Sequence, residues 1–384
     1  MTGRNTPLHV LFTTDTVGGV WDFSRTLSGE LRSRGQQVTL LALGGLTPEQ
    51  RRQADLVTSD VVSAPLRLEW MQGSADDVLR TRELVEMLVR IRRPDLVHAN
   101  QYAAVTACGV PTVLTAHSDV LSWHRWTRRA DEAELASLRR SPYASTVEAA
   151  LAGASSVVAV SGSVAADLRE HYGLARPVRV VHNGWPAVGE EPAPLAARPR
   201  RTLLGGRAWD EAKNVAIAAR AAAGWDPGEL LLAGEIRHPE TGSRQPIAGV
   251  RALGFLSRGD LDAQLAAARV YLGTARYEPF GLLALQAALH GCALVLNDIP
   301  SYREVWDGAA AFYARDDPAA LRDVWRSVLD DGGKAQRLAR AARERAVGRY
   351  SASRMADEYL DAYEQATRGR GRREQRGLKV PWQR

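Results

Sequence analysis

Two stretches of this 384-residue chain place charged side chains beside glycines, in the pattern of an anion-binding turn. In the first stretch, Gly205-Gly206-Arg207 ends a strand-like run, and Lys213 follows near the start of a helical pattern. Guanidinium and ammonium groups at such a turn can hold the oxygens of a phosphate. Lysine occurs elsewhere only at 334 and 379, so the choice of lysine at 213 favours a point charge there. The alternative is a solvated surface lysine.

The second stretch, residues 276–283, links a strand-like run to a helical one and contains Glu278, Pro279 and Gly281. Backbone N–H groups from Gly281 to Leu283 are expected at a helix start, where they can hold phosphate or sugar oxygens. Pro279 disfavours the helical conformation at Glu278 and helps to aim its carboxylate. Helix capping alone would also explain Glu278.

Gly18 and Gly19 form a further turn, between a strand-like run over 9–13 and a helical pattern over 20–34. Paired glycines at such a turn let backbone N–H groups approach an anion with the helix dipole assisting. The alternative is a tight turn that needs only a positive φ angle. No Gly-Lys-Ser/Thr sequence follows, which excludes a Walker-type phosphate loop.

Histidine and tryptophan residues in the first half of the chain are candidates for contacting a second substrate. His117 follows a strand-like run and either faces a substrate or is a structural, half-buried histidine. We predict that Trp21, Trp123 and Arg125 contact an acceptor, because indole rings stack on sugar or aromatic rings. Core packing is the alternative for each tryptophan, and a solvated side chain is the alternative for Arg125.

The net charge of +6 comes from the end of the chain, because residues 368–384 contain seven cations and one acid, Glu374. The rest of the chain is neutral, so we expect no nucleic-acid-binding surface on the folded body. Residues 368–384 are rich in arginine and glycine, and we predict a disordered basic tail that makes peripheral contact with anionic surfaces. An RNA- or membrane-associated protein that acts through this tail, with strongly salt-dependent binding, is the alternative.

Short aliphatic runs alternate with amphipathic stretches, which predicts parallel sheets covered by helices on both faces. The helical patterns include 76–92 in the first half and 282–290 and 352–367 in the second. The predicted strands are residues 9–13, 38–43, 96–99, 112–116 and 157–160, and then 202–205, 230–233, 251–255, 270–273 and 293–296.

Residues 186–199 contain four prolines and interrupt this alternation. We therefore predict an α/β protein of two Rossmann-like, doubly wound domains facing a central cleft. The predicted domains are residues 1–186, which would bind the acceptor, and 200–350, which would bind the donor. Residues 187–199 are the predicted linker, and the helix over 352–367 can pack on either domain.

Neither a disulfide framework nor a metal centre is indicated by the sequence. Cys108 and Cys292 lie far apart in apolar runs, which is typical of buried thiols in a reducing compartment. Asp260-Leu261-Asp262 stands at a predicted helix start, where capping explains it. The N-terminal residues are polar and carry no apolar leader pattern, so we expect a cytoplasmic protein.

The residues from Glu278 to Leu282, followed by an apolar helix and Gly291-Cys292-Ala293-Leu294-Val295, resemble the Glu-x7-Glu signature of the retaining glycosyltransferases of family 4. That family has the GT-B fold, and the resemblance implies that the helix over 352–367 returns to pack on the first domain, residues 1–186. The resemblance covers about residues 8–367. Other segments agree in order: Gly18-Gly19, Thr115-Ala116-His117, Val160-Ser161, His182-Asn183-Gly184, Gly206-Arg207 with Lys213, and Pro300-Ser301-Tyr302-Arg303-Glu304-Val305.

This resemblance implies a metal-independent enzyme without a cofactor, which moves a sugar from a nucleoside diphosphate to a hydroxyl acceptor. The acceptor would be a glycan, a glycolipid or a small molecule. Transfer would occur on the front face of the sugar, with retention of configuration. A related nucleotide-sugar or phosphorylase-type enzyme of the same fold is an alternative.

The resemblance also implies roles for individual residues. Arg207 and Lys213 would clamp the donor diphosphate, Glu278 would contact the donor sugar, and His117 would lie beside the reacting sugar. These four form the predicted catalytic set. The further donor-binding residues are Gly18, Gly19, Phe255, Leu256, Phe280, Gly281, Leu282, Leu283 and Gln286.

The chain departs from the family pattern at Gln286, where the family has its second glutamate. That carboxylate usually binds the nucleotide ribose, and a glutamine hydrogen-bonds hydroxyl groups without charge assistance. The spacing from Arg207 to Lys213 is also one residue longer than the common family version. A GT-B nucleotide-sugar-binding protein with weak or no turnover is therefore the alternative function.

Overall fold

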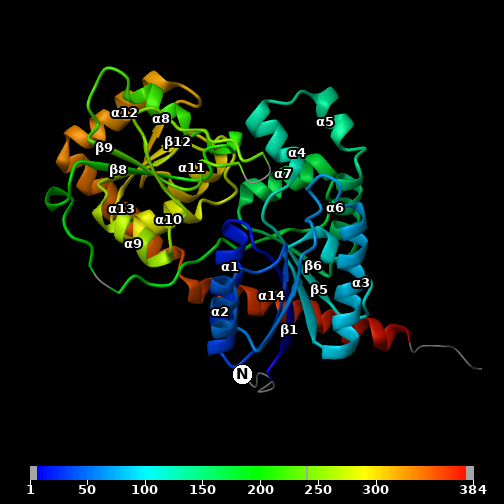
Figure 1. The fold of residues 1–384 in the computed structure, drawn as a ribbon. Coiled ribbons are helices and arrows are strands. Elements are labelled where there is room, and N and C mark those ends of the chain that lie inside the picture. The colour runs from blue at the N-terminus through cyan, green and yellow to red at the C-terminus, as the bar shows by residue number, and fades with distance from the viewer. Residues whose placement is uncertain (1–6, 190, 239–240, 378–384) are drawn as a thin grey trace, which may run out of the picture. The chain divides into compact units, whose positions relative to one another are not determined.

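The computed structural model describes residues 7–189, 191–238 and 241–377, and the described chain divides into two compact units (Figure 1). The first unit comprises the described residues of Met1–Leu121, Glu132–Gly184 and Ala352–Arg384. The second comprises those of Ser122–Asp131 and Trp185–Ser351. The chain therefore passes from the first unit to the second at Gly184. The predicted boundary at residue 186 lies two residues further on.

The first unit contains a parallel sheet in the order β3-β2-β1-β4-β5-β6-β7. This is a doubly wound order: the chain first adds β2 and β3 on one side of β1 and then returns to add β4 to β7 on the other side. The sequence analysis found five of these strands and missed β3 and β7, which are short or half exposed. The strands are β1 (His9–Asp15), β2 (Gln37–Leu43), β3 (Asp60–Ala64), β4 (Leu96–Ala99), β5 (Thr112–Ala116), β6 (Ser156–Ala159) and β7 (Arg179–Val180).

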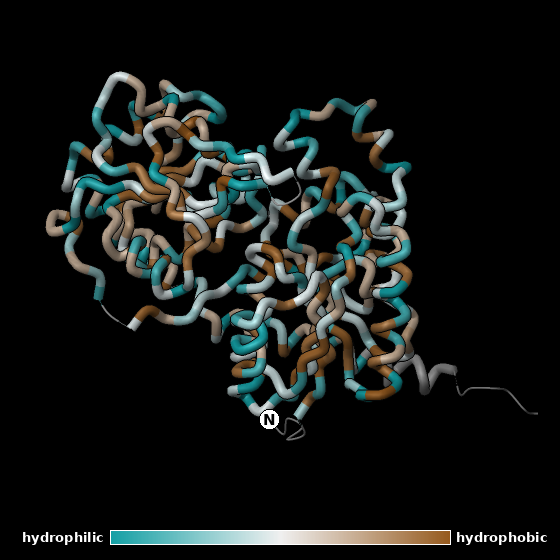
Figure 2. Tube along the Cα trace, viewed as in Figure 1, coloured by the Kyte–Doolittle hydropathy of each residue, from teal (hydrophilic) through white to brown (hydrophobic). Residues whose placement is uncertain are grey.

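Helices cover the faces of this sheet, and the apolar residues concentrate along the strands inside the unit (Figure 2). The helical pattern over 20–34 is α1 (Gly19–Ser33), and the pattern over 76–92 is α3 (Ala75–Arg92). The other helices are α2 (Pro48–Val57), η1 (Tyr102–Ala104), α5 (Glu132–Leu138), α6 (Pro142–Gly153) and α7 (Gly162–Tyr172), with α4 (Val120–Trp123) at the border of the two units.

The second unit contains a parallel sheet in the order β10-β9-β8-β11-β12-β13, again doubly wound. Leu204, Leu232, Leu272 and Val295 of its strands form a buried core with Trp325. The strands are β8 (Arg201–Gly205), β9 (Glu229–Ala233), β10 (Arg251–Gly254), β11 (Val270–Gly273), β12 (Ala293–Asn297) and β13 (Ala311–Tyr313). The sequence analysis missed β13, a short strand in which two of the three residues are half-buried.

The helices of the second unit include a short π-helical segment, η2, which lies in residues 122–131. Helix α10 (Leu282–Leu289) corresponds to the predicted helix over 282–290. The others are η2 (His124–Arg128), η3 (Leu195–Ala197), η4 (Glu211–Lys213), α8 (Ala216–Ala222), α9 (Arg258–Ala267), α11 (Pro300–Trp306), α12 (Pro318–Asp330) and α13 (Gly332–Arg349).

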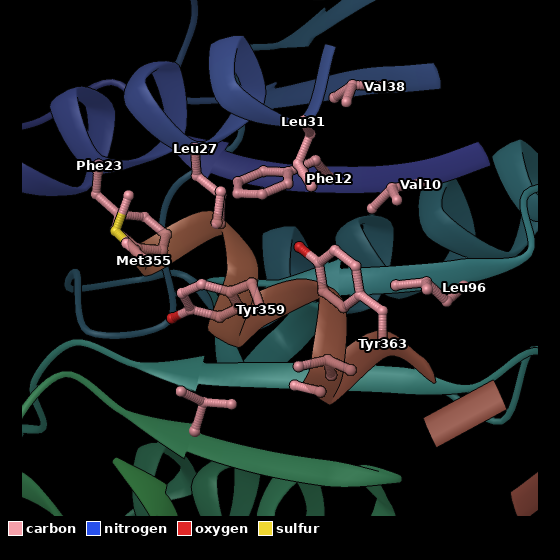
Figure 3. Packing of buried hydrophobic residues seen from close by; sticks show 14 of the residues in the cluster. Val10, Phe12, Phe23, Leu27, Leu31, Val38, Leu96, Met355, Tyr359 and Tyr363 are labelled. Carbon is pink, nitrogen blue, oxygen red and sulfur yellow. The ribbon is translucent and has the colours of Figure 1, made fainter. Parts of the chain in front are cut away.

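Helix α14 (Ala352–Gly377) belongs to the first unit, although it follows the second unit in sequence. Figure 3 shows Met355, Tyr359 and Tyr363 of this helix packed among side chains of α1 and β1. All three are fully buried, and the Tyr363 hydroxyl lies 2.5 Å from Nδ1 of the buried His98. The last helix therefore completes the core of the unit that begins the chain.

The prediction of a disordered tail from residue 368 is wrong for the residues up to Gly377, which continue α14. Arginine, glutamate and glutamine have high helix propensity, and Glu364 and Arg368 form an ion pair one turn apart (2.8 Å). These local preferences extend the helix beyond its apolar face. The remaining tail residues, 378–384, lie outside the described residues.

Residues 187–199, predicted as a linker, pack on the second unit in the region that the structure describes. Leu195 joins the core of that unit. The guanidinium of Arg198, which is 4% exposed, donates to the carbonyl groups of Ala193, Ala268 and His290. The prolines therefore end the alternation of strands and helices without leaving this segment unattached.

The two cysteines are free thiols, as expected, but only Cys292 is buried. Burial raises the pKa of the Cys292 thiol to about 12, so this thiol stays protonated. Cys108 is half-buried in the irregular segment between η1 and β5, which corrects the prediction that both are buried.

Candidate functional site

The adjacent strands β8 and β11 bring the two predicted phosphate-binding stretches together in the second unit. These strands pair in parallel, with Leu204 opposite Leu272. Because parallel strands end at the same edge of a sheet, the turn after Gly205 and the loop after Gly273 leave the sheet side by side. This edge carries Arg207, Lys213 and Glu278.

Lys213 and Glu278 form an ion pair with 2.7 Å between Nζ and Oε2. Both side chains are about one-fifth exposed, so the pair is partly desolvated but within reach of a ligand. The Thr274 hydroxyl donates to the carbonyl of Lys213 (2.8 Å), which ties the two segments together at the backbone as well. The structure therefore joins two residues that the sequence analysis had assigned to one site from separate motifs.

Gly206 allows Lys213 to take this position. Its φ angle is +126°, and a Cβ atom there would lie 2.9 Å from Cγ of Lys213. A side chain at position 206 would therefore push the lysine stem away from the strand end.

Arg207 lies at the same edge and is held by neighbours in its own turn. Its guanidinium donates to Oδ2 of Asp210 (2.6 Å) and lies 5.0 Å from the centre of the Trp209 ring. More than a third of the side chain is exposed. A cation that is oriented on one side and exposed on another can take a phosphate oxygen without rearrangement of the backbone.

Helix α10 begins at this edge, and no side chain of a described residue caps its start. Gly281 precedes the helix with φ +93°, and a Cβ atom there would lie 2.8 Å from the ring of Tyr302. The first backbone N–H groups, at Leu282 and Leu283, thus remain available to an anion. Leu283 reaches back to β8, since a Cβ atom on Gly205 would lie 1.8 Å from its Cδ2. Phe280 is buried and packs against Tyr350.

Gln286 lies one turn into α10 and is 4% exposed. Its backbone carbonyl accepts from His290, whereas its side-chain amide makes no hydrogen bond to a described residue. Neither polar atom of this amide is among the enclosed, unpartnered atoms of the described residues, so the amide can reach a ligand. This residue therefore remains a candidate ligand contact.

Phe255 and Leu256 follow β10, at the same end of the second sheet. Phe255 is 86% exposed, and its backbone N–H donates to Oε1 of Glu235 (2.9 Å). Leu256 is half-buried. An exposed phenylalanine on an anchored backbone can stack on a nucleotide base, so the predicted role of this loop stays a prediction.

In the first unit, the ends of β1, β4 and β5 carry a neutral hydrogen-bonded network. Asn100 donates from Nδ2 to the carbonyl of Thr13 (2.6 Å), and its Oδ1 lies 2.8 Å from Nε2 of His117. The Thr13 hydroxyl donates to Gln101 (2.7 Å). The sequence analysis missed Asn100, although a polar residue directly after the apolar strand 96–99 was a usable signal.

This network determines the protonation of His117. Because Oδ1 of Asn100 only accepts hydrogen bonds, Nε2 of His117 is the donor and Nδ1 carries the lone pair. Burial lowers the pKa of His117 to about 3, so the ring is neutral near pH 7. A neutral ring with Nδ1 unprotonated can accept a hydrogen bond from a substrate hydroxyl.

Gly18 and Gly19 lie between β1 and α1, at the same edge of the first sheet as His117. No side chain of a described residue caps the start of α1, so its first N–H groups can face an anion. The Gly18-Gly19 loop and His117 belong to the first unit, whereas Arg207, Lys213 and Glu278 belong to the second. A site shared by the two units stays a prediction.

The structure gives different environments to the three predicted acceptor contacts. Trp21 is 7% exposed in the core of the first unit, and its indole N–H donates to Gln53 (3.2 Å), so packing explains it and corrects the prediction of a stacking surface. Trp123 and Arg125 are half-buried in the segment 122–131, which groups with the second unit. The guanidinium of Arg128 lies 5.1 Å from the Trp123 ring.

No three histidine, cysteine, aspartate or glutamate side chains gather as a metal ion requires within the residues that the structure describes. Ser257 caps α9 through the backbone N–H of Asp260, as expected for a capping role. No helix in the described part of the chain combines the length and the apolar composition needed to cross a membrane.

Comparison with known proteins agrees with this arrangement. Residues 17–186 match the family model "Glycosyltransferase Family 4", and residues 239–345 match "Glycosyl transferases group 1". The chain is 29% identical to a glycogen synthase of Mycobacterium tuberculosis, over 92% of each protein.

Two solved structures share the fold. The sucrose-phosphate synthase of Thermosynechococcus elongatus has a TM-score of 0.72 and 18% identity, with 94% of this chain and 100% of that chain covered. HepE of Anabaena, solved with UDP and glucose, has a TM-score of 0.70 and 17% identity, with 93% and 99% covered.

Two doubly wound α/β units and a cationic strand edge beside an uncapped helix define a glycosyltransferase of the GT-B fold class. The two family models between them span most of the chain. The chain belongs to glycosyltransferase family 4.

Proposed function

We propose that this enzyme moves a sugar from a nucleoside diphosphate to a hydroxyl group of an acceptor, with retention of configuration and without a metal ion. The observation that carries the proposal is the edge of the second sheet. There Arg207, Lys213 and the uncapped start of α10 present positive charge and N–H donors from two chain segments. Such an edge suits the two phosphates of a sugar nucleotide.

In the proposed reaction the bond between the sugar C1 atom and the leaving phosphate oxygen breaks. The acceptor oxygen forms the new bond to C1 on the same face, and its proton passes to the leaving diphosphate. Negative charge on the diphosphate grows during this step. Arg207, Lys213 and the amides of Leu282 and Leu283 stabilise that charge, which is electrostatic preorganisation. No covalent intermediate on the protein is needed.

Glu278 and His117 orient the donor sugar in this proposal. The carboxylate of Glu278 accepts hydrogen bonds from sugar hydroxyl groups while it keeps Lys213 in place. Nδ1 of His117 accepts a hydrogen bond from one further sugar hydroxyl, because this nitrogen is unprotonated in the neutral ring. Gln286 supplies its unpartnered amide to the ribose hydroxyls, where the family pattern has a carboxylate.

Metal independence is part of the proposal because two side-chain cations supply the charge that a divalent ion would otherwise supply. Turnover that is unchanged in EDTA would support it. Loss of turnover in EDTA that magnesium or manganese restores would contradict it. For the acceptor, the name of the mycobacterial relative, glycogen synthase, makes an α-glucan the first acceptor class to test.

A second candidate function, nucleotide-sugar binding with weak or no turnover, is favoured by Gln286. A glutamine at this position lacks the charge that strengthens hydrogen bonds to ribose hydroxyls. If this function is correct, Gln286→Glu should gain turnover that the wild-type protein lacks. Equal or higher turnover in the wild-type protein supports the enzyme.

Thermal unfolding with UDP, GDP, ADP and dTDP, each alone and as a sugar conjugate, tests the proposal. A ligand at 100 times its dissociation constant stabilises the folded state by about 2.7 kcal/mol. We expect one nucleotide to raise the stability of the wild-type protein. The same nucleotide should not stabilise Arg207→Ala. Arg251→Ala, which removes an exposed arginine paired with Glu229 in the same unit, should keep it. If none of these ligands stabilises the wild-type protein, donor binding is contradicted.

A further inference from the structure

Asp316 occupies an unusual backbone position between β13 and α12. Its φ angle is +60°, in the left-handed region where residues other than glycine are uncommon. Aspartate tolerates this conformation better than most residue types, but glycine adopts it without strain. The presence of an aspartate here calls for a contribution from its carboxylate.

The carboxylate of Asp316 is largely buried and connects three chain segments of the second unit. Oδ1 accepts from Nε of Arg276 (2.8 Å) and from Nδ2 of Asn214 (3.2 Å). Oδ2 accepts from the guanidinium of Arg129 (3.1 Å). Burial by itself would raise the pKa of Asp316, but the hydrogen bond and charge of Arg276, the hydrogen bond of Arg129 and the charge of Arg315 outweigh it and hold the pKa below its ordinary value.

Two of these partners lie next to Lys213 and Glu278 in the sequence, the residues that form the ion pair at the candidate site. Asn214 directly follows Lys213, and Arg276 stands two residues before Glu278. The backbone N–H of Arg276 also donates to the carbonyl of Ala212 (2.7 Å). A single oxygen of Asp316 thus fixes the two segments that carry the ammonium of Lys213 and the carboxylate of Glu278.

We propose that Asp316 is the positioning residue of the Lys213–Glu278 pair, and its role in catalysis rests on the proposed function. Asp316 sets the relative placement of the two segments without contacting the donor itself. Through Arg129, its second oxygen also anchors residues 122–131, the segment that contains Trp123 and Arg125. The sequence analysis missed Asp316 because its partners lie 40 or more residues away.

The test compares Asp316→Gly with Asp316→Asn. Glycine relieves the backbone but removes a carboxylate that accepts three hydrogen bonds, so the melting temperature should fall modestly, with the relieved backbone offsetting part of the loss. Without ligand, hydrogen exchange at the Arg276 amide should accelerate about tenfold, while the core amides of β8 keep the wild-type rate. The turnover number of Asp316→Gly should fall about 100-fold, the effect of an approximately 1 Å misplacement, with a smaller change in KM for the donor.

Asp316→Asn retains an oxygen for Asn214 or Arg276 and tolerates the backbone conformation, so it should recover part of the lost turnover. The matched control is Asp330→Asn, which removes an exposed carboxylate paired with Arg200 and Arg326 in the same unit. This control should keep wild-type exchange at Arg276 and wild-type turnover.

Wild-type exchange at Arg276 in Asp316→Gly would overturn the positioning role, and so would a turnover number equal to that of the wild-type protein. A wild-type protein that neither binds a sugar nucleotide nor transfers a sugar would contradict the proposed function instead. In that case the exchange rates, which need no ligand, still decide whether Asp316 positions the Lys213–Glu278 pair.

Discussion

At the carboxyl edge of the first sheet, Asn100 and His117 form a neutral hydrogen-bonded pair. At the corresponding edge of the second sheet, Lys213 and Glu278 form an ion pair. The two sheets share a doubly wound parallel order, so the backbone architecture does not explain this difference. It comes from the types of side chain that follow the strands, because His117, Lys213 and Glu278 are all half-buried.

Burial removes charge at the first edge, where the pKa of His117 falls to about 3. At the second edge, the opposite charges compensate each other and both groups remain partly exposed. A neutral acceptor suits a sugar hydroxyl, whereas Arg207, Lys213 and the uncapped start of α10 suit a diphosphate. The comparison teaches that one fold can provide two kinds of recognition by varying the side chains at equivalent strand ends.

The largest expected effect tests the charged edge. Arg207→Ala should lower turnover about 10²- to 10³-fold, or about 2.7–4 kcal/mol of transition-state stabilisation, if Arg207 acts as an electrostatic donor to the leaving group. Steady-state kinetics of the variant provide the measurement. Arg251→Ala, an exposed arginine of the same unit, should keep wild-type turnover. Unchanged turnover in Arg207→Ala would refute the role of Arg207. It would also mean that the charged edge does not stabilise the leaving group.

The next effect tests a second buried hydrogen-bonded group of the first unit, in which the ring nitrogens of His98 contact the hydroxyls of Tyr363 and Thr115. Tyr363→Phe leaves Nδ1 of the buried His98 without its partner and should lower the free energy of unfolding by about 1–3 kcal/mol. Chemical denaturation is the measurement. Tyr313→Phe is the matched control, because the Tyr313 hydroxyl is buried without a partner among the described residues. It should be neutral or stabilising, and equal losses in both variants would show that the His98 contact contributes nothing.

The smallest effect concerns pH. The pKa of His117 in the folded state, about 3, lies below the ordinary value of 6.5. As pH falls below 6.5, the unfolded chain therefore binds a proton that the folded chain does not, and stability falls by about 1.4 kcal/mol per pH unit from this group. His117→Gln should remove this part of the slope between pH 6.5 and 5.

Denaturation of both proteins at pH 8, where the imidazole is neutral in both states, measures the cost of the substitution itself. The difference in the free energy of unfolding between the wild-type protein and His117→Gln is measured at pH 8 and at pH 5. The change in this difference between the two pH values is the contribution of His117 titration. A difference that does not change with pH would mean that His117 titrates normally, and that the first edge is not a neutral site.

Much of this molecule could be predicted from local sequence patterns. The ten predicted strands are all present, because strands buried on both faces read as continuous aliphatic runs. Glycines and charges at strand ends marked Lys213, Glu278 and the start of α10 as separate candidates, and the resemblance to family 4 assigned them to one site. Trp21 was misassigned because the same residue type serves a core and a stacking surface equally well, and burial alone separates the two.

The sequence by itself determined the two parallel sheets, their glycine turns and the charged residues after the strands. Each of these depends on residues a few positions apart. The tertiary structure alone decided that Asn100 sets the tautomer of His117 and that Asp316 joins Asn214 to Arg276. These contacts join residues far apart in the chain, and their hydrogen bonds depend on distance and burial, which local periodicity does not encode.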